Sequence, residues 1–150
     1  MTRHSVSIDA STIKLSGRFL PATNGQPRAL LVALHGGGYT SKYFDTAPPS
    51  LLDFCASLGY SILALDRPGY GSATDVPRDQ LSFDSQVPIL RQALEKIWDD
   101  YGQQSVGMFL VGHSIGGMLS LYRTRMRVRR SVHPQERRKD YATVHSNIEP

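Results

Sequence analysis

The sequence predicts an α/β fold in which a mostly parallel sheet is flanked by helices. Short apolar runs alternate with longer segments of helical periodicity, the order expected of parallel strands joined by right-handed crossovers. Residues 29–34 are apolar throughout, as in a strand buried on both faces. Residues 106–117 pass from an apolar run through closely spaced glycines into a helix. A chain of 150 residues is long enough for one domain with a sizeable core.

The first segments predict a small antiparallel pair at a sheet edge. Residues 5–8 and 11–20 alternate weakly between apolar and polar side chains. The side chains expected to point inward are Val6, Ile8, Ile13, Leu15 and Phe19. Residues 21–28 hold two prolines and an Asn-Gly pair, which predict a turn before the apolar strand at 29–34.

A first helix is expected to begin near Ser50 and to end at Gly59, a suitable residue for a left-handed cap. Its apolar residues are expected to share one buried face: Leu51, Leu52, Phe54, Cys55 and Leu58. Since Cys55 is the only cysteine, it excludes an intramolecular disulfide, and its apolar setting predicts a buried structural thiol. A strand is expected at residues 60–65, and a rigid turn follows at 66–72.

A longer helix is expected to run from Ser82 or Ser85 to Tyr101, where Gly102 stops it. Pro88 is tolerated only near the first turns, so the pattern leaves the start open. One apolar stripe is expected to be core: Val87, Leu90, Leu94, Ile97, Trp98 and Tyr101.

The pattern Gly-x-Ser-x-Gly at residues 112–116 is typical of a nucleophile elbow. A serine hydroxyl is a poor nucleophile, so it must be lifted to where a base and a carbonyl carbon can reach it. A sharp turn does this, and it leaves no room for a Cβ at Gly112 or Gly116. The alternative is an ordinary glycine-rich turn that contains Ser114. The strand expected before this turn and the helix expected after it disfavour that alternative. That helix is expected to face the sheet with Met118, Leu119 and Tyr122.

Three motifs in this order resemble the α/β-hydrolase superfamily of esterases, lipases and peptidases. They are His-Gly-Gly-Gly-Tyr at 35–39, Leu-Asp-Arg-Pro-Gly-Tyr-Gly-Ser at 65–72, and the elbow. The resemblance implies acyl transfer to water with Ser114 as nucleophile, and it gives the oxyanion-hole N–H groups to Gly37 and Ile115. Epoxide or haloalkane chemistry is disfavoured because those relatives carry Asp at the nucleophile position. Neither a cofactor nor a metal is expected.

Other polar residues are expected to have supporting roles. A loop-orienting hydrogen bond is favoured over general-base work for His35, and packing is expected for His113. Asp66 is expected to accept loop N–H groups, because the family places its catalytic acid after the nucleophile. An acid followed by a histidine also occurs after Ser114, in the order of the family's triad: Glu136 or Asp140, and then His145. A disordered segment, however, would not hold such a base within hydrogen-bond reach of the serine. His133 with His145 does not make a zinc site.

The resemblance ends near Tyr122. Residues 1–122 hold nine Lys or Arg against ten Asp or Glu, and residues 123–150 hold eight against three. The arginines between 123 and 130 spread around a helix axis and leave no wide apolar face. We therefore expect 1–122 to form the N-terminal part of an α/β-hydrolase domain and 123–150 to be a disordered basic tail. The abrupt change at Arg123 is what a shifted reading frame or a retained intervening sequence would produce.

Two functions follow from these observations. The first is a serine hydrolase acting on a small-molecule ester or amide, with the catalytic acid and base missing from the chain. The second is a non-catalytic relative whose basic tail mediates binding.

Without a signal peptide or an apolar span, the sequence predicts a cytoplasmic protein with no membrane partner, and the nearly neutral body disfavours nucleic acid. A sheet that ends after the elbow strand predicts self-association.

Overall fold

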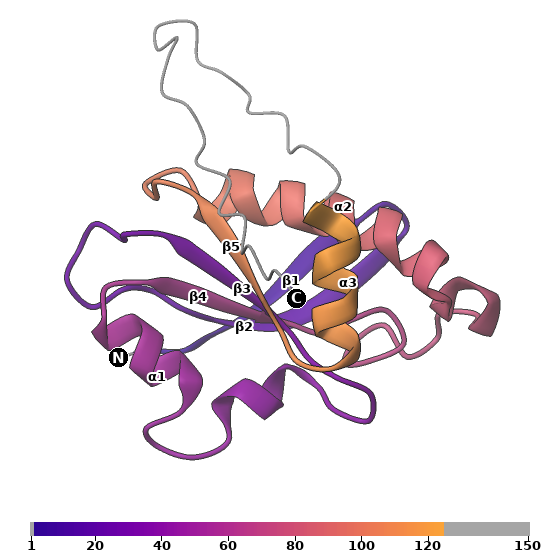
Figure 1. Cartoon of the computed structure of the whole chain (residues 1–150), viewed down its shortest axis with the longest axis horizontal. Coiled ribbons are helices and arrows are strands. Elements are labelled where there is room, and N and C mark those ends of the chain that lie inside the picture. Colours follow the sequence, from indigo (N-terminus) through magenta and orange to yellow (C-terminus); the bar gives the residue numbers. More distant parts are fainter. Residues whose placement is uncertain (1, 125–150) are drawn as a thin grey trace, which may run out of the picture.

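A computed structural model describes residues 2–124, which form a mixed sheet with helices on both faces (Figure 1). The strand order is β1-β2-β4-β3-β5. The strands are β1 (His4–Ala10), β2 (Ile13–Leu20), β3 (Leu30–Leu34), β4 (Ser61–Leu65) and β5 (Met108–Gly112). β3 pairs in parallel with β4 and β5, whereas β2 pairs antiparallel with both β1 and β4. The predicted edge pair and parallel strands are confirmed, and the β2–β4 pairing makes the sheet mixed.

The register of the three parallel strands brings the predicted motifs to one edge of the sheet. Leu34, the last residue of β3, lies opposite Leu65 of β4 and Gly112 of β5. The loops that follow these residues therefore leave the sheet side by side. They are the glycine-rich loop at 35–39, the turn at 66–72 and the elbow.

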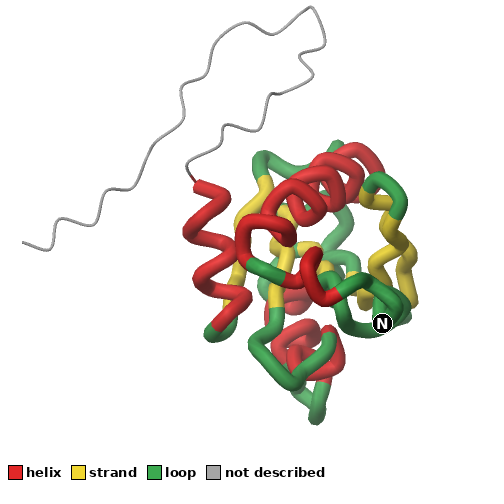
Figure 2. The backbone as a smooth tube through the Cα atoms, turned by 90° about the vertical axis from the view of Figure 1, so that its right-hand side faces the viewer, coloured by secondary structure: helices red, strands yellow, loops and turns green. Residues whose placement is uncertain are grey.

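The helices lie in two layers around the sheet (Figure 2). They are α1 (Leu51–Ser57), α2 (Phe83–Tyr101) and α3 (Ile115–Thr124), with 3-10 turns η1 (Ser41–Asp45) and η2 (Arg78–Leu81). α2 and α3 pack on one face around Leu63 and Leu94, and α1 packs on the other around Leu52 and Ile62. Because neighbouring β4 residues belong to opposite cores, all of β4 is buried. Within residues 2–124, no helix is both long and apolar enough to cross a bilayer.

Helix α1 begins as predicted, but its buried face differs from the prediction. A capping box starts it, since the Ser50 Oγ accepts the Asp53 N–H at 3.2 Å and the Asp53 carboxylate accepts the Ser50 N–H at 2.9 Å. Its buried residues are Leu52, Cys55 and Ala56. Burial raises the pKa of the Cys55 thiol, in agreement with a structural role.

The prediction that Leu51, Phe54 and Leu58 join this face is wrong. Their exposed fractions are 37%, 58% and 47%. At about 100° per residue, these three residues form a second stripe roughly a third of a turn away from the buried one. The sheet contacts only one stripe of so short a helix, and the sequence pattern had merged the two.

Helix α2 follows its prediction closely. The Ser82 Oγ accepts the Ser85 N–H at 3.2 Å, so the helix begins after Ser82 and Pro88 lies in its second turn. Leu90, Leu94 and Ile97 are buried. The other members of the stripe, Val87, Trp98 and Tyr101, are half-buried.

Helix α3 faces the sheet with fewer apolar residues than predicted. Leu119 is buried, whereas Met118 and Tyr122 are 52% and 57% exposed, so the prediction is wrong for these two. A Cβ on Gly116 would lie 2.0 Å from the Leu34 carbonyl oxygen. This close approach fixes which side of the helix meets the sheet: the residues three and four positions on, Leu119 and Ser120, are buried, and Met118 and Tyr122 turn away.

Candidate active site

The elbow places Ser114 at the tip of a strained turn between β5 and α3. Ser114 is exposed and has a φ of 52°, a conformation that costs a residue with a side chain about 1–3 kcal/mol. A Cβ on Gly112 would lie 2.4 Å from the Gly117 Cα, so neither Gly112 nor Gly116 has room for a side chain. The His113 N–H donates to the Leu34 carbonyl at 3.0 Å and ties the turn to β3. The strained, exposed turn expected from the sequence is therefore present.

The glycine-rich loop after β3 lies directly against this turn. A Cβ on Gly36 would lie 3.2 Å from the Ser114 Cβ, and one on Gly37 would lie 3.1 Å from the Ile115 Cδ1. The Gly38 N–H donates to the Tyr70 hydroxyl at 3.3 Å. Within residues 2–124, the N–H groups of Gly37 and Ile115 have no hydrogen-bond acceptor. Two unused donors therefore come from the two segments that meet at Ser114.

His35 orients this loop, as predicted. Its ring is fully buried, with Nδ1 2.8 Å from the Gly36 carbonyl oxygen and Nε2 accepting the Arg67 N–H at 3.1 Å. This pattern requires the neutral tautomer with hydrogen on Nδ1. Burial lowers the pKa of His35, and the nearby Arg67 charge lowers it further. Because both ring nitrogens are engaged, His35 is not a general base.

Asp66 has the structural role expected of it. Its buried carboxylate accepts the Ser41 N–H and, at 2.6 Å, the Ser16 hydroxyl. It therefore joins β2, the end of β4 and the start of η1 beneath the loops.

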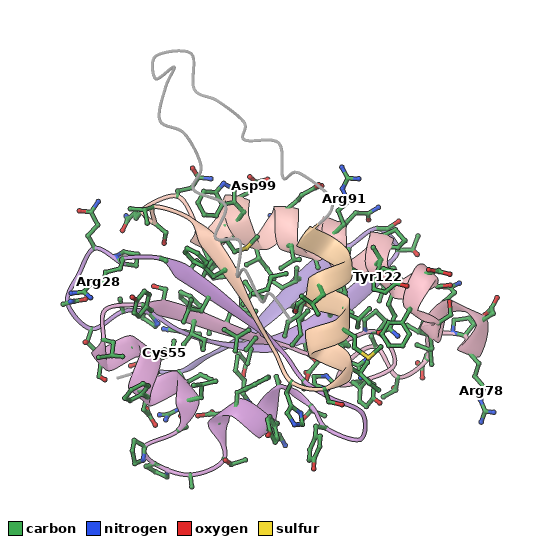
Figure 3. All side chains as sticks on the ribbon, viewed as in Figure 1. Arg28, Cys55, Arg78, Arg91, Asp99 and Tyr122 are labelled. Atoms are coloured by element: carbon green, nitrogen blue, oxygen red, sulfur yellow. The ribbon has the colours of Figure 1, made fainter. Side chains whose placement is uncertain are left out.

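Arg67 is the site residue that the sequence reasoning missed. Arg28, Arg78 and Arg91 project outward, as labelled in Figure 3, whereas Arg67 is only 2% exposed. Its Nε donates to the His35 carbonyl at 2.9 Å, its Nη2 to the Gly36 carbonyl at 3.2 Å and its Nη1 to the Gln86 Oε1 at 2.9 Å. Its only mark in the sequence is its place, two residues after the apolar end of β4 and directly before Pro68, and this place does not by itself separate a buried arginine from an exposed one.

Aromatic side chains border the elbow on one side. The His113 ring stacks on Tyr43 at a centroid distance of 4.7 Å, and Tyr39 lies 4.8 Å from Tyr43. His113 therefore packs, as expected. Its Nδ1 is buried without a hydrogen-bond partner in the described part of the chain.

The remaining candidates lie outside the described residues: His133, Glu136, Asp140 and His145. Among residues 2–124, no three His, Cys, Asp or Glu side chains are grouped so that they could hold a metal ion.

Solved structures share this fold. A laboratory-evolved variant of potato epoxide hydrolase StEH1 superposes with a TM-score of 0.65 at 18% identity, over 81% of this chain and 35% of that protein. The esterase Pf2001 from Pyrococcus furiosus gives 0.63 at 21% identity, over 81% of this chain and 43% of that one. At such identities the likeness concerns the fold alone.

Sequence relatives give the same result. Protein ABHD14A from Danio rerio is 42% identical over 74 residues, which are 47% of this chain and 25% of that protein. The chain thus covers a quarter of that relative and less than half of the similar solved structures. Residues 31–140 match the Alpha/beta hydrolase family. The strained serine turn, the adjoining glycine loop and this match over most of the sequence lead to one conclusion: the chain belongs to the α/β hydrolase family.

Proposed function

We propose that the protein is a serine hydrolase that transfers the acyl group of a small-molecule ester or amide to water through Ser114. The observation that carries this proposal is the exposed Ser114, held at a positive φ beside two unused N–H groups. Attack of its Oγ on an acyl carbon would place negative charge on the carbonyl oxygen. The N–H groups of Gly37 and Ile115 would then stabilise that oxyanion, a contribution typically worth about 3–4 kcal/mol per donor.

Serine chemistry fits this site better than epoxide opening. The similar solved structures include both an epoxide hydrolase and an esterase, so the fold alone does not choose between them. The family's epoxide-opening members carry Asp at the nucleophile position, whereas position 114 is Ser. An ester carbonyl also gives the two N–H groups a developing charge to bind.

The catalytic acid and base are proposed to come from outside residues 2–124. His35 has both ring nitrogens engaged, and the Asp66 carboxylate is used by the loops around it. In the family's order an acid and then a histidine follow the serine. Asp140 and His145 occur in that order in this chain and are the first pair to test.

The test is hydrolysis of a short-chain p-nitrophenyl ester, with covalent labelling by a fluorophosphonate. Ser114→Ala is expected to abolish labelling and to lower kcat/KM at least about a thousandfold, because no other group supplies the nucleophile. Ser57→Ala, at an exposed serine on α1, is the matched control and should behave like the unchanged protein. Equal labelling of the two variants would contradict the proposal and favour a non-catalytic binding protein.

His145→Ala then locates the base. A loss of rate comparable with that of Ser114→Ala would place the base in residues 125–150. An unchanged rate, with Ser114 still required, would exclude His145.

A further inference from the structure

We infer that Arg67 is a positioning residue for the oxyanion hole: with His35, it holds and polarises the peptide unit that joins Gly36 to Gly37. The inference rests on the proposed function, since the Gly37 N–H is the donor proposed there. It adds a residue that touches neither Ser114 nor the substrate.

The peptide bond between Gly36 and Gly37 is planar. The Gly36 carbonyl and the Gly37 N–H belong to one planar trans unit, so they point in opposite directions. The Gly36 oxygen accepts two hydrogen bonds, from the His35 Nδ1 at 2.8 Å and from the Arg67 Nη2 at 3.2 Å. Holding the oxygen therefore sets the direction of the N–H group on the other side.

This loop needs such an external hold. Residues 36–38 are all glycine and are the most freely rotating residues of a chain. Arg67 also donates to the His35 carbonyl at 2.9 Å, and Tyr70, whose ring centroid lies 4.8 Å from the guanidinium carbon, accepts the Gly38 N–H. In the described residues the loop is thus tied on both sides of the Gly37 N–H, and the Gly37 N–H itself has no acceptor there.

Arg67 also acts through its charge. Its three side-chain hydrogen bonds go to the neutral oxygens of His35, Gly36 and Gln86, and it forms no salt bridge within residues 2–124. Burying a cation without a carboxylate is unfavourable. Here the uncompensated charge lies behind the Gly36 oxygen, where it draws electron density and makes the Gly37 N–H a stronger donor. A negative oxyanion would benefit from this arrangement, whereas the ground-state ester would benefit less.

Kinetics separate this role from a structural one. We expect Arg67→Met to lower kcat of p-nitrophenyl acetate hydrolysis about tenfold or more while KM stays within about twofold, because the lost interaction is made in the transition state. Arg67→Lys should lie between, since it keeps the charge and loses the planar fork. Leu94→Ala, a variant that truncates a buried core side chain of α2, is the control. It should lower the melting temperature without lowering kcat of the folded protein.

A second readout does not depend on turnover. In protein labelled with ¹³C,¹⁵N-glycine, the Gly36 carbonyl carbon and the Gly37 N–H should both shift upfield in Arg67→Lys, because a weaker donor polarises the peptide less. Leu94→Ala should leave both signals in place. If Arg67→Met does not fold, Arg67→Lys supplies both measurements.

The outcomes keep the two proposals apart. If Ser114→Ala hydrolyses the ester as well as the unchanged protein, the proposed function is wrong, and the glycine shifts alone decide whether Arg67 polarises the loop. If Ser114→Ala is inactive while Arg67→Lys leaves kcat and both shifts unchanged, the proposed function stands and the role of Arg67 is overturned.

Discussion

Gly116 shows how a single missing side chain shapes the site. A Cβ there would lie 2.0 Å from the Leu34 carbonyl oxygen, whereas a Cβ on the next residue, Gly117, would lie 3.3 Å from the Gly112 oxygen. Both contacts are with backbone atoms, but the first is far too short to be relieved, whereas the second requires only a small shift of the neighbouring atom. Close backbone packing therefore requires glycine at position 116 but not at position 117, although the two neighbouring glycines look alike in the sequence.

Alanine should destabilise the protein at position 116 and have little effect at position 117. Gly116→Ala is expected to destabilise the protein by about 1–3 kcal/mol, because the overpacked Cβ pushes α3 away from β3. It should also slow fluorophosphonate labelling of Ser114. Gly117→Ala should stay within about 1 kcal/mol of the unchanged protein, since alanine's helix propensity offsets the tight contact. Urea unfolding measures both, and equal stabilities would refute the assigned contact.

Helix α1 shows, for a whole element, that similar residues in the sequence can differ in their packing. Its sequence carries two apolar stripes, and the sheet covers only the one with Leu52, Cys55 and Ala56. The outer stripe, with Leu51, Phe54 and Leu58, remains exposed. The burial of a helix thus depends more on which stripe the neighbouring strands contact than on how many apolar residues the helix contains.

Truncating one residue from each stripe should separate them. Leu52→Ala removes a fully buried side chain, and we expect it to lower the free energy of unfolding by about 2–5 kcal/mol. Phe54→Ala removes a larger side chain that is 58% exposed, so a change within about 0.5 kcal/mol is expected. Chemical denaturation of the two variants is the measurement. A large loss in Phe54→Ala would mean that the outer stripe is covered in solution.

At the scale of the whole molecule, β5 is the edge strand of the described sheet on the side of the candidate site. Its outer backbone groups have no neighbouring strand within residues 2–124. Phe109 on this strand and Leu121 on α3 are 58% and 71% exposed. An unpaired strand beside exposed apolar side chains is a surface that favours association.

The 150-residue chain is therefore predicted to self-associate as its concentration rises. Phe109→Lys should reduce this association, because a charge on an edge strand opposes pairing with another chain. Phe54→Lys, at an equally exposed position on α1, should leave it unchanged if the β5 edge is responsible. Sedimentation velocity over a range of concentrations distinguishes them. A concentration-independent monomer would show that the edge is already protected.

Much of the fold could be predicted because local rules settle it. The apolar run of β3, the largely apolar run of β4, the serine caps of α1 and α2, and Gly102 after α2 each favour a particular backbone state nearly regardless of context. The strained turn at Ser114 was predictable for the same reason, since the spacing of its glycines reflects how closely strand and helix approach. The catalytic roles of Ser114, Gly37 and Ile115 remain predictions.

The tertiary structure decided what depends on residues distant in sequence. The pairing of β2 with β4, the buried stripe of α1 and the outward turn of Met118 follow from how the sheet meets each element. Arg67 is the clearest case. Nothing local distinguishes it from an exposed arginine, because its three acceptors come from the loop after β3 and from α2. Hydrogen-bond geometry of this kind exists only once separate segments are packed, so the sequence determined the elements and the elbow, and packing determined which charge supports them.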